Sequence, residues 1–89
     1  MLKPPRTLAV VVNWNSRADT LTCLVALARS EPIAPNVIVV DNASSDGSVA
    51  AVRAAFPAVE VIENRRNLHF ARGANQGLRR AVERGAACV

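Results

Sequence analysis

The chain has 89 residues, a formal net charge of +4 and 51% hydrophobic residues. This length allows one small domain, and the apolar content is far above that of disordered segments, so we expect a packed fold. Only 3% of the residues are aromatic and none is tyrosine, which argues against a base-stacking surface for nucleic acid. No apolar run approaches the roughly 20 residues of a membrane span, and no signal peptide is visible.

Positive charge is concentrated in the last third of the chain, where six arginines fall between Arg65 and Arg84. This density indicates either a solvated basic face or a surface for an anionic partner such as phosphate, nucleic acid or acidic lipid. The two cysteines, Cys23 and Cys88, form no C-x-x-C pair. We expect both to be buried free thiols in a reducing compartment. One histidine and two unclustered cysteines argue against a structural zinc site.

Apolar runs of strand length alternate with segments of helical period after a short tail at residues 1–6. Strands are predicted at residues 8–12, 37–40 and 59–62, and a fourth begins at 86–89. Helix faces are predicted from the apolar spacing of three sets: Leu21, Leu24, Val25 and Ala28; Val49, Val52 and Phe56; and Ala74, Leu78, Ala81 and Val82. Ser16, with Asp19 three residues on, and Asp46 are the predicted caps of the first two helices.

Strands separated by single helices lie parallel with right-handed crossovers, which predicts half of a doubly wound α/β sheet. Such sheets bind ligands where strands end and helices begin. The loops on that rim are residues 13–16, 41–47 and 64–70, which are also the most polar parts of the chain. Sequence order and composition therefore predict one site at this edge.

The rim offers distinct chemistry in each loop. Trp14 presents a flat face for a heterocycle or sugar, or else covers the sheet edge. Asp41 and Asn42 end a strand and can accept a hydrogen bond from a ring N–H, whereas Ser45, Asp46 and Ser48 are assigned to turn chemistry. The third loop precedes a helix N-terminus and carries arginines, which favours an anion site. Phosphate-binding and dinucleotide glycine motifs are both absent.

Three sequence stretches together resemble the start of a family 2 glycosyltransferase, closest to its rhamnosyltransferase-like branch. They are VVVNWN at residues 10–15, VVDNASSDGS at 39–48 and NLHFARGANQG at 67–77. The resemblance implies a Rossmann-like, three-layer α/β/α half of a GT-A fold with a parallel sheet in the strand order 3-2-1-4. It also implies binding of a nucleotide-diphospho-sugar, with dTDP or UDP as the carrier, and transfer with inversion to a glycan or lipid-linked acceptor.

The same resemblance assigns residues to the donor. The nucleotide-binding set is Val12, Asn13, Trp14, Asn15, Asp41, Asn42 and Ser44, with Val12 and Trp14 flanking the base. The loop on the diphosphate side contributes Asn67, His69, Arg72, Gly73 and Asn75, of which Asn67 and Asn75 are expected to fix the loop backbone. His69 stands where the family has glycine, a residue that permits positive φ. His69 is either a tolerated variant or a phosphate contact.

The family's metal-binding acidic motif and catalytic base follow the fourth strand. We therefore expect residues 7–89 to be the donor-binding part of a larger domain, ending inside that strand and inactive alone. Mg²⁺ or Mn²⁺ is expected only in the full-length enzyme. One alternative is a stand-alone nucleotide-binding module without catalysis. Another is a signalling βα domain, but such a domain needs several acids at strand ends and a lysine late in the fold, and here only Asp41 ends a strand and Lys3 is the single lysine.

Two further expectations concern the oligomeric state of the protein and its location in the cell. An unpaired fourth strand is a template for another chain, which predicts a homodimer through the C-terminal strand edge with Cys88 near the contact. The expected location is the cytoplasm, with peripheral association at the inner face of the membrane as an alternative.

Overall fold

Strands and helices alternate along the chain in a computed structural model that describes residues 7–29, 36–83 and 87–88. The strands are β1 (Thr7–Asn13), β2 (Asn36–Asp41), β3 (Glu60–Glu63) and β4 (Ala87–Cys88). The helices are α1 (Arg17–Ala28), α2 (Ser48–Ala55) and α3 (His69–Glu83). The strands pair in parallel, in the order β3-β2-β1-β4. The predicted α/β class with a parallel sheet is confirmed.

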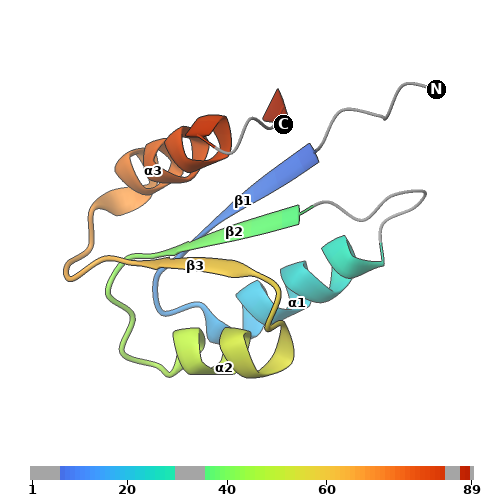
Figure 1. Cartoon of the computed structure of the whole chain (residues 1–89). Helices are drawn as coiled ribbons and strands as arrows, with labels where there is room; N and C mark the ends of the chain where they lie inside the picture. The colour runs from blue at the N-terminus through green and yellow to red at the C-terminus, as the bar shows by residue number, and fades with distance from the viewer. Residues whose placement is uncertain (1–6, 30–35, 84–86, 89) are drawn as a thin grey trace.

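The sheet is covered on both faces. Figure 1 shows α1 and α2 on one side of the strands and α3 on the other, which makes three layers. Strand β2 lies between β1 and β3, and its residues Ile38, Val39 and Val40 are 0–2% exposed. A continuous β-branched run is expected where a strand is buried on both faces, and each such side chain contributes about 1.5–3 kcal/mol by burial.

The core consists of two clusters, one on each face of β2. Ile38 and Val40 pack with Ala81 of α3, while Val39 packs with Leu24 of α1 and Val52 of α2. Successive strand residues point to opposite faces, so this alternation lets one strand anchor both helical layers.

The core-facing side of α3 differs from the prediction. Leu78 and Val82 were expected in the core but are 40% and 67% exposed, and the buried residues are Gly73, Gly77 and Ala81. A Cβ added to Gly77 would overlap Cγ1 of Val10. Helix and strand approach so closely that only small residues fit between them.

The apolar face predicted for α1 is also only partly buried. Thr20 and Leu24 are its buried residues, whereas Val25 is 39% exposed and Ala28 is exposed. Cys23 is a free and exposed thiol, so its predicted burial was wrong: the helix turns this position outward. The side chain of Cys88 and the predicted tail at residues 1–6 lie outside the described part of the chain.

The two helices α1 and α2 share one capping carboxylate. Ser16 precedes α1, but its hydroxyl donates to the carbonyl of Trp14 (3.1 Å) and makes no cap. Asp46 Oδ2 instead accepts the backbone N–H of Arg17 at 3.0 Å. Its Oδ1 accepts the backbone N–H of Ser48 at 3.0 Å and also the Ser48 hydroxyl. The hydroxyl bond from Ser48 is the main reason why the pKa of Asp46 is lowered.

The residue at the N-cap position of α2 is Gly47, not the predicted Asp46. Gly47 has φ +79°, a left-handed conformation that glycine adopts without a steric penalty. This turn brings the Asp46 carboxylate back over the first turn of α2, so Asp46 still acts as the cap from one residue earlier.

Candidate functional site

The ends of three strands lie at one level of the sheet. Asn13 of β1 is in register with Asp41 of β2, which is in register with Glu63 of β3. The loops that follow these strands therefore emerge side by side, as predicted.

Asn13 is the buried centre of this region, with 1% of its surface exposed. Its Nδ2 donates to Asp41 Oδ1 at 2.7 Å and to Ser44 Oγ at 3.0 Å. Its Oδ1 accepts the hydroxyl of Thr20 at 2.6 Å. Every polar atom of this side chain is used inside the protein, so Asn13 ties β1 to the second loop and to α1.

Asp41 lies beneath the second loop and is only 3% exposed. Besides the bond from Asn13, its Oδ2 accepts the backbone N–H of Ser44 at 3.0 Å. The Asp41 side chain does not line the open cleft described below. A carboxylate oxygen can accept more than one hydrogen bond, so a contact between Asp41 and a base stays a prediction.

The first two loops are joined to each other by reciprocal bonds. Ser44 Oγ accepts the backbone N–H of Asn15 at 2.8 Å, and Asn15 Oδ1 accepts the backbone N–H of Ser45 at 2.7 Å. Asn15 and Ala43 adopt positive φ angles of 49° and 63°. These contacts give Asn15 and Ser44, both predicted as nucleotide contacts, a structural role in positioning Trp14.

Asn42 connects the second loop to the third and is 1% exposed. Its Nδ2 donates to the backbone carbonyl of His69 at 3.1 Å, and its Oδ1 accepts Nδ2 of Asn64 at 2.9 Å. Asn64 and Gln76 then exchange two amide hydrogen bonds of 2.7 and 2.8 Å. The third loop is therefore anchored on both sides.

His69 adopts a left-handed backbone conformation, of the kind that glycine adopts without a steric penalty. Its φ is +65°, its backbone N–H donates to Asn67 Oδ1 at 2.8 Å, and its side chain is exposed. The loop was predicted to run through Phe70, but α3 already begins at His69. Asn67 fixes the loop backbone as predicted.

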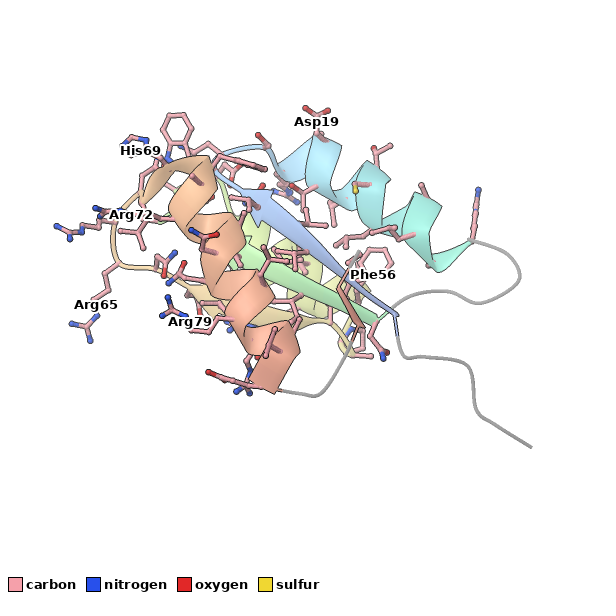
Figure 2. The ribbon with its side chains drawn as sticks, turned by 90° about the horizontal axis from the view of Figure 1, so that it is seen from above. Asp19, Phe56, Arg65, His69, Arg72 and Arg79 are labelled. Atoms are coloured by element: carbon pink, nitrogen blue, oxygen red, sulfur yellow. The ribbon has the colours of Figure 1, made fainter. Side chains whose placement is uncertain are left out.

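The other residues predicted on the diphosphate side lie along α3. Arg72 is exposed and projects away from the helix (Figure 2). Gly73 is buried, and a Cβ there would stand 3.1 Å from Cγ1 of Val12 and 3.2 Å from Nδ2 of Asn42. The side chain of Asn75 is exposed and makes no hydrogen bond to any residue that the structure describes, so the expected bond from Asn75 to the loop is wrong. The Gln76 side chain bonds to Asn64 of this loop instead.

An open cleft of about 500 Å³ lies between the three loops. All three sequence stretches contribute to its lining, and Ser16 directly after the first stretch adds to it: Val12, Trp14, Ser16, Asn42, Asn67, His69 and Phe70. Five of these were predicted; Ser16 and Phe70 were not. Phe70 lies inside the third quoted stretch, and its size in a polar loop is the signal that could have identified it. Trp14 is 54% exposed and Phe70 is 73% exposed.

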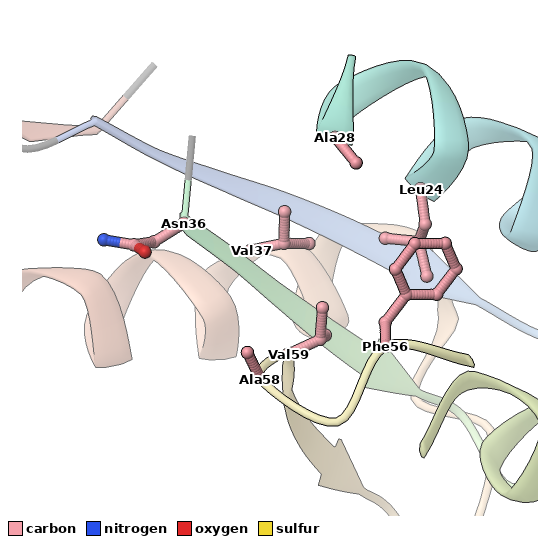
Figure 3. Close-up of a pocket in the computed structure, with 7 residues that line it drawn as sticks. All are labelled: Leu24, Ala28, Asn36, Val37, Phe56, Ala58 and Val59. Carbon is pink, nitrogen blue, oxygen red and sulfur yellow. The ribbon is translucent and has the colours of Figure 1, made fainter. Parts of the chain in front are cut away.

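A smaller hollow of about 190 Å³ lies at the other ends of the strands (Figure 3). It is lined mainly by apolar side chains: Leu24, Ala28, Asn36, Val37, Phe56, Ala58 and Val59. None of the predicted site residues borders it, so the motif-bearing cleft is the candidate site.

The described part of the chain has neither a cluster of metal ligands nor a membrane-spanning helix. In the described part of the chain, no group of three or more His, Cys, Asp or Glu side chains could hold a metal ion. These residues therefore do not fit a metal site. No helix of the described ranges is long and apolar enough to span a bilayer.

Comparison with known proteins shows the family of this chain. Residues 8–87 match the family described as glycosyl transferase family 2. The chain belongs to glycosyl transferase family 2. This agrees with the resemblance seen in the three sequence stretches, whereas the rhamnosyltransferase-like branch stays a prediction.

Two proteins that are similar to this chain are much longer. The succinoglycan biosynthesis protein ExoU of Rhizobium meliloti (strain 1021) is 37% identical over 51 residues, which are 57% of this chain and 15% of ExoU. The mannosyltransferase PcManGT of Pyrobaculum calidifontis, solved in complex with GDP-Man and Mn²⁺, superposes with a TM-score of 0.69 and 27% identity. That likeness covers 89% of this chain and 25% of PcManGT.

Proposed function

We propose that this chain binds the nucleotide part of a nucleotide-diphospho-sugar donor in the cleft between its three loops. The observation that carries the proposal is the cleft itself: it lies at the carboxyl ends of parallel strands, where α/β sheets bind ligands, and predicted residues form most of its wall. The complex of PcManGT with GDP-Man supports the donor class.

The base would lie against Trp14. An indole that is 54% exposed at the mouth of a cleft offers a flat apolar face to a heterocycle. Val12 lines the same cleft and would contact the other side of the ring. Asn42 also lines the cleft. The nitrogen and the oxygen of its side-chain amide each make a hydrogen bond to the protein, so its contribution is to hold this part of the wall rigid.

The diphosphate would lie toward α3. His69 and Asn67 line this side of the cleft, and free N–H groups in the first turn of a helix attract anions. Arg72 lies one turn further along α3 and makes no ion pair within the described ranges. A guanidinium is suited to phosphate because it donates several hydrogen bonds in one plane.

The finer features of the reaction belong to the same proposal. Inverting transfer of a sugar such as rhamnose or, by analogy with PcManGT, mannose would occur in a full-length enzyme acting on a glycan or lipid-linked acceptor. The described residues offer no metal site, so acids elsewhere in that enzyme would hold Mg²⁺ or Mn²⁺. We therefore expect the 89-residue chain alone to transfer no sugar. A non-catalytic nucleotide-binding module is the second candidate.

Calorimetry with UDP-, dTDP- and GDP-sugars tests the proposal. Asp41→Ala removes the acceptor of two internal bonds and should weaken binding by about 1–3 kcal/mol, whereas Asp19→Ala removes an exposed acid of equal charge and should not. Circular dichroism establishes that each variant is folded, and Asp41→Asn keeps the side-chain shape if Asp41→Ala unfolds. Equal affinity in all variants would contradict a role for the Asp41 region.

A further inference from the structure

The segment from Glu60 to Glu83 carries five arginines and three glutamates. All three glutamates are engaged in ion pairs. Glu60 pairs with Arg80 at 2.7 Å and Glu83 pairs with the same guanidinium at 3.3 Å, while Glu63 pairs with Arg53 of α2 at 2.9 Å. The acids of this segment therefore neutralise Arg80 and Arg53 and leave the remaining arginines uncompensated.

Four exposed arginines, which we call the arginine face, have no hydrogen bond or ion pair within the described residues: Arg65, Arg66, Arg72 and Arg79. Arg72 and Arg79 are seven positions apart on α3 and so share one side of the helix. Arg65 and Arg66 lie in the loop that leads into it. Figure 2 shows that the side chains of Arg65, Arg72 and Arg79 lie on the same side of α3, with Arg65 on the loop.

We propose that the arginine face docks this chain on an anionic lipid surface. Uncompensated like charges repel one another, and a surface of negative headgroups removes that repulsion. Arginine also suits a bilayer interface because its apolar stem can lie along the surface while the guanidinium stays hydrated.

An exposed aromatic side chain accompanies this charge. Phe70, in the first turn of α3, is 73% exposed, and phenylalanine beside basic residues is typical of interfacial membrane sites. Nucleic acid fits less well, since the chain has only 3% aromatic residues and none is tyrosine. Phe70 also lines the cleft, so docking would bring the mouth of the cleft close to the lipid.

Vesicle co-sedimentation without nucleotide tests the proposal with a matched pair of double variants. Arg65→Gln/Arg79→Gln removes two charges from the arginine face, and Arg17→Gln/Arg29→Gln removes two exposed arginines at the ends of α1, on the opposite face of the sheet. Neither Arg65 nor Arg79 is a proposed donor contact. The outcome is therefore independent of nucleotide binding.

We expect the wild-type chain to bind phosphatidylcholine vesicles only when they contain phosphatidylglycerol, and less strongly as salt is raised. Each arginine near such a surface changes partition roughly fivefold, so Arg65→Gln/Arg79→Gln should bind about 25-fold more weakly. The α1 variant should stay within about twofold of wild type. Phe70→Ser should lose the binding that persists at high salt.

Three results would overturn the proposal. Equal losses in both double variants would show that net charge acts without a defined face. Equal binding to vesicles lacking phosphatidylglycerol would exclude headgroup charge as the cause. Tighter binding to duplex DNA than to anionic vesicles, at equal phosphate concentration, would assign the arginine face to nucleic acid instead.

Discussion

Gly77 of α3 lies directly against Val10 of β1, and a methyl group on the glycine would overlap Cγ1 of the valine and stand 3.0 Å from its Cγ2. Valine is short and stiff about χ1, so it cannot move aside as a long side chain would. This contact sets the distance of α3 from the sheet, and α3 in turn supplies His69, which lines the cleft.

Gly77→Ala should therefore destabilise the protein although alanine favours helix. The gain in helix propensity is about 1 kcal/mol, and overpacking a close contact costs about 1–3 kcal/mol. Val10→Ala removes the two methyl groups that clash, so Gly77→Ala should cost less stability in a Val10→Ala background than in the wild-type chain. Urea unfolding of the single and double variants gives the free energy of unfolding of each. If the two effects simply add, the Gly77–Val10 contact does not limit which side chains fit there.

The Asp46 carboxylate, which accepts hydrogen bonds at the starts of both α1 and α2, predicts that the protein loses stability in acid. The pKa of Asp46 is lowered from its ordinary value of 3.8, chiefly by the hydroxyl of Ser48. The stabilisation is thus fully present above pH 3.8 and disappears as the pH falls through the lower, folded-state pKa. Thermal unfolding at several pH values should show this loss in wild type but not in Asp46→Asn. Ser48→Ala should move the loss to higher pH; an unmoved profile would contradict the assigned cause.

His69 tests whether the loop needs glycine. A non-glycine residue at φ +65° is strained, but glycine adds freedom to the unfolded chain. His69→Gly should therefore change stability by less than about 1 kcal/mol. His69→Val, with a β-branched side chain at positive φ, should cost about 1–3 kcal/mol. Equal stability of the two variants in urea unfolding would mean that the loop relaxes to another conformation.

The predicted homodimer through the C-terminal strand edge stays a prediction. β4 borders only β1 among the described strands, and Val82 on the neighbouring helix α3 is 67% exposed. Sedimentation at micromolar concentration should show a dimer in wild type that Val82→Glu dissociates. A monomeric wild-type chain would contradict it.

Sequence pattern predicted the element order and the edge of the sheet where the loops meet, because the buried β-branched runs and the polar loops alternate without ambiguity. The prediction of which helix residues are buried failed where the distance between α3 and the sheet decides which side chains fit. Leu78 and Val82 follow a helical period, but the close approach at Gly77 turns them outward. Sequence pattern also cannot tell a side chain that faces a ligand from one that holds a loop. Both polar atoms of the Asn13 side chain bond within the protein, and its contact with a nucleotide stays a prediction.

Trp14 provides the most direct test of the donor-binding cleft, since it is the single tryptophan of the chain and lines that cleft. We expect its fluorescence to change saturably when the wild-type chain is titrated with UDP-, dTDP- or GDP-sugar, with half-saturation near millimolar, equivalent to about 4 kcal/mol. The matching free nucleoside diphosphate should compete. No saturable change with any of the three donors, from a chain shown to be folded, would contradict nucleotide-sugar binding in this cleft.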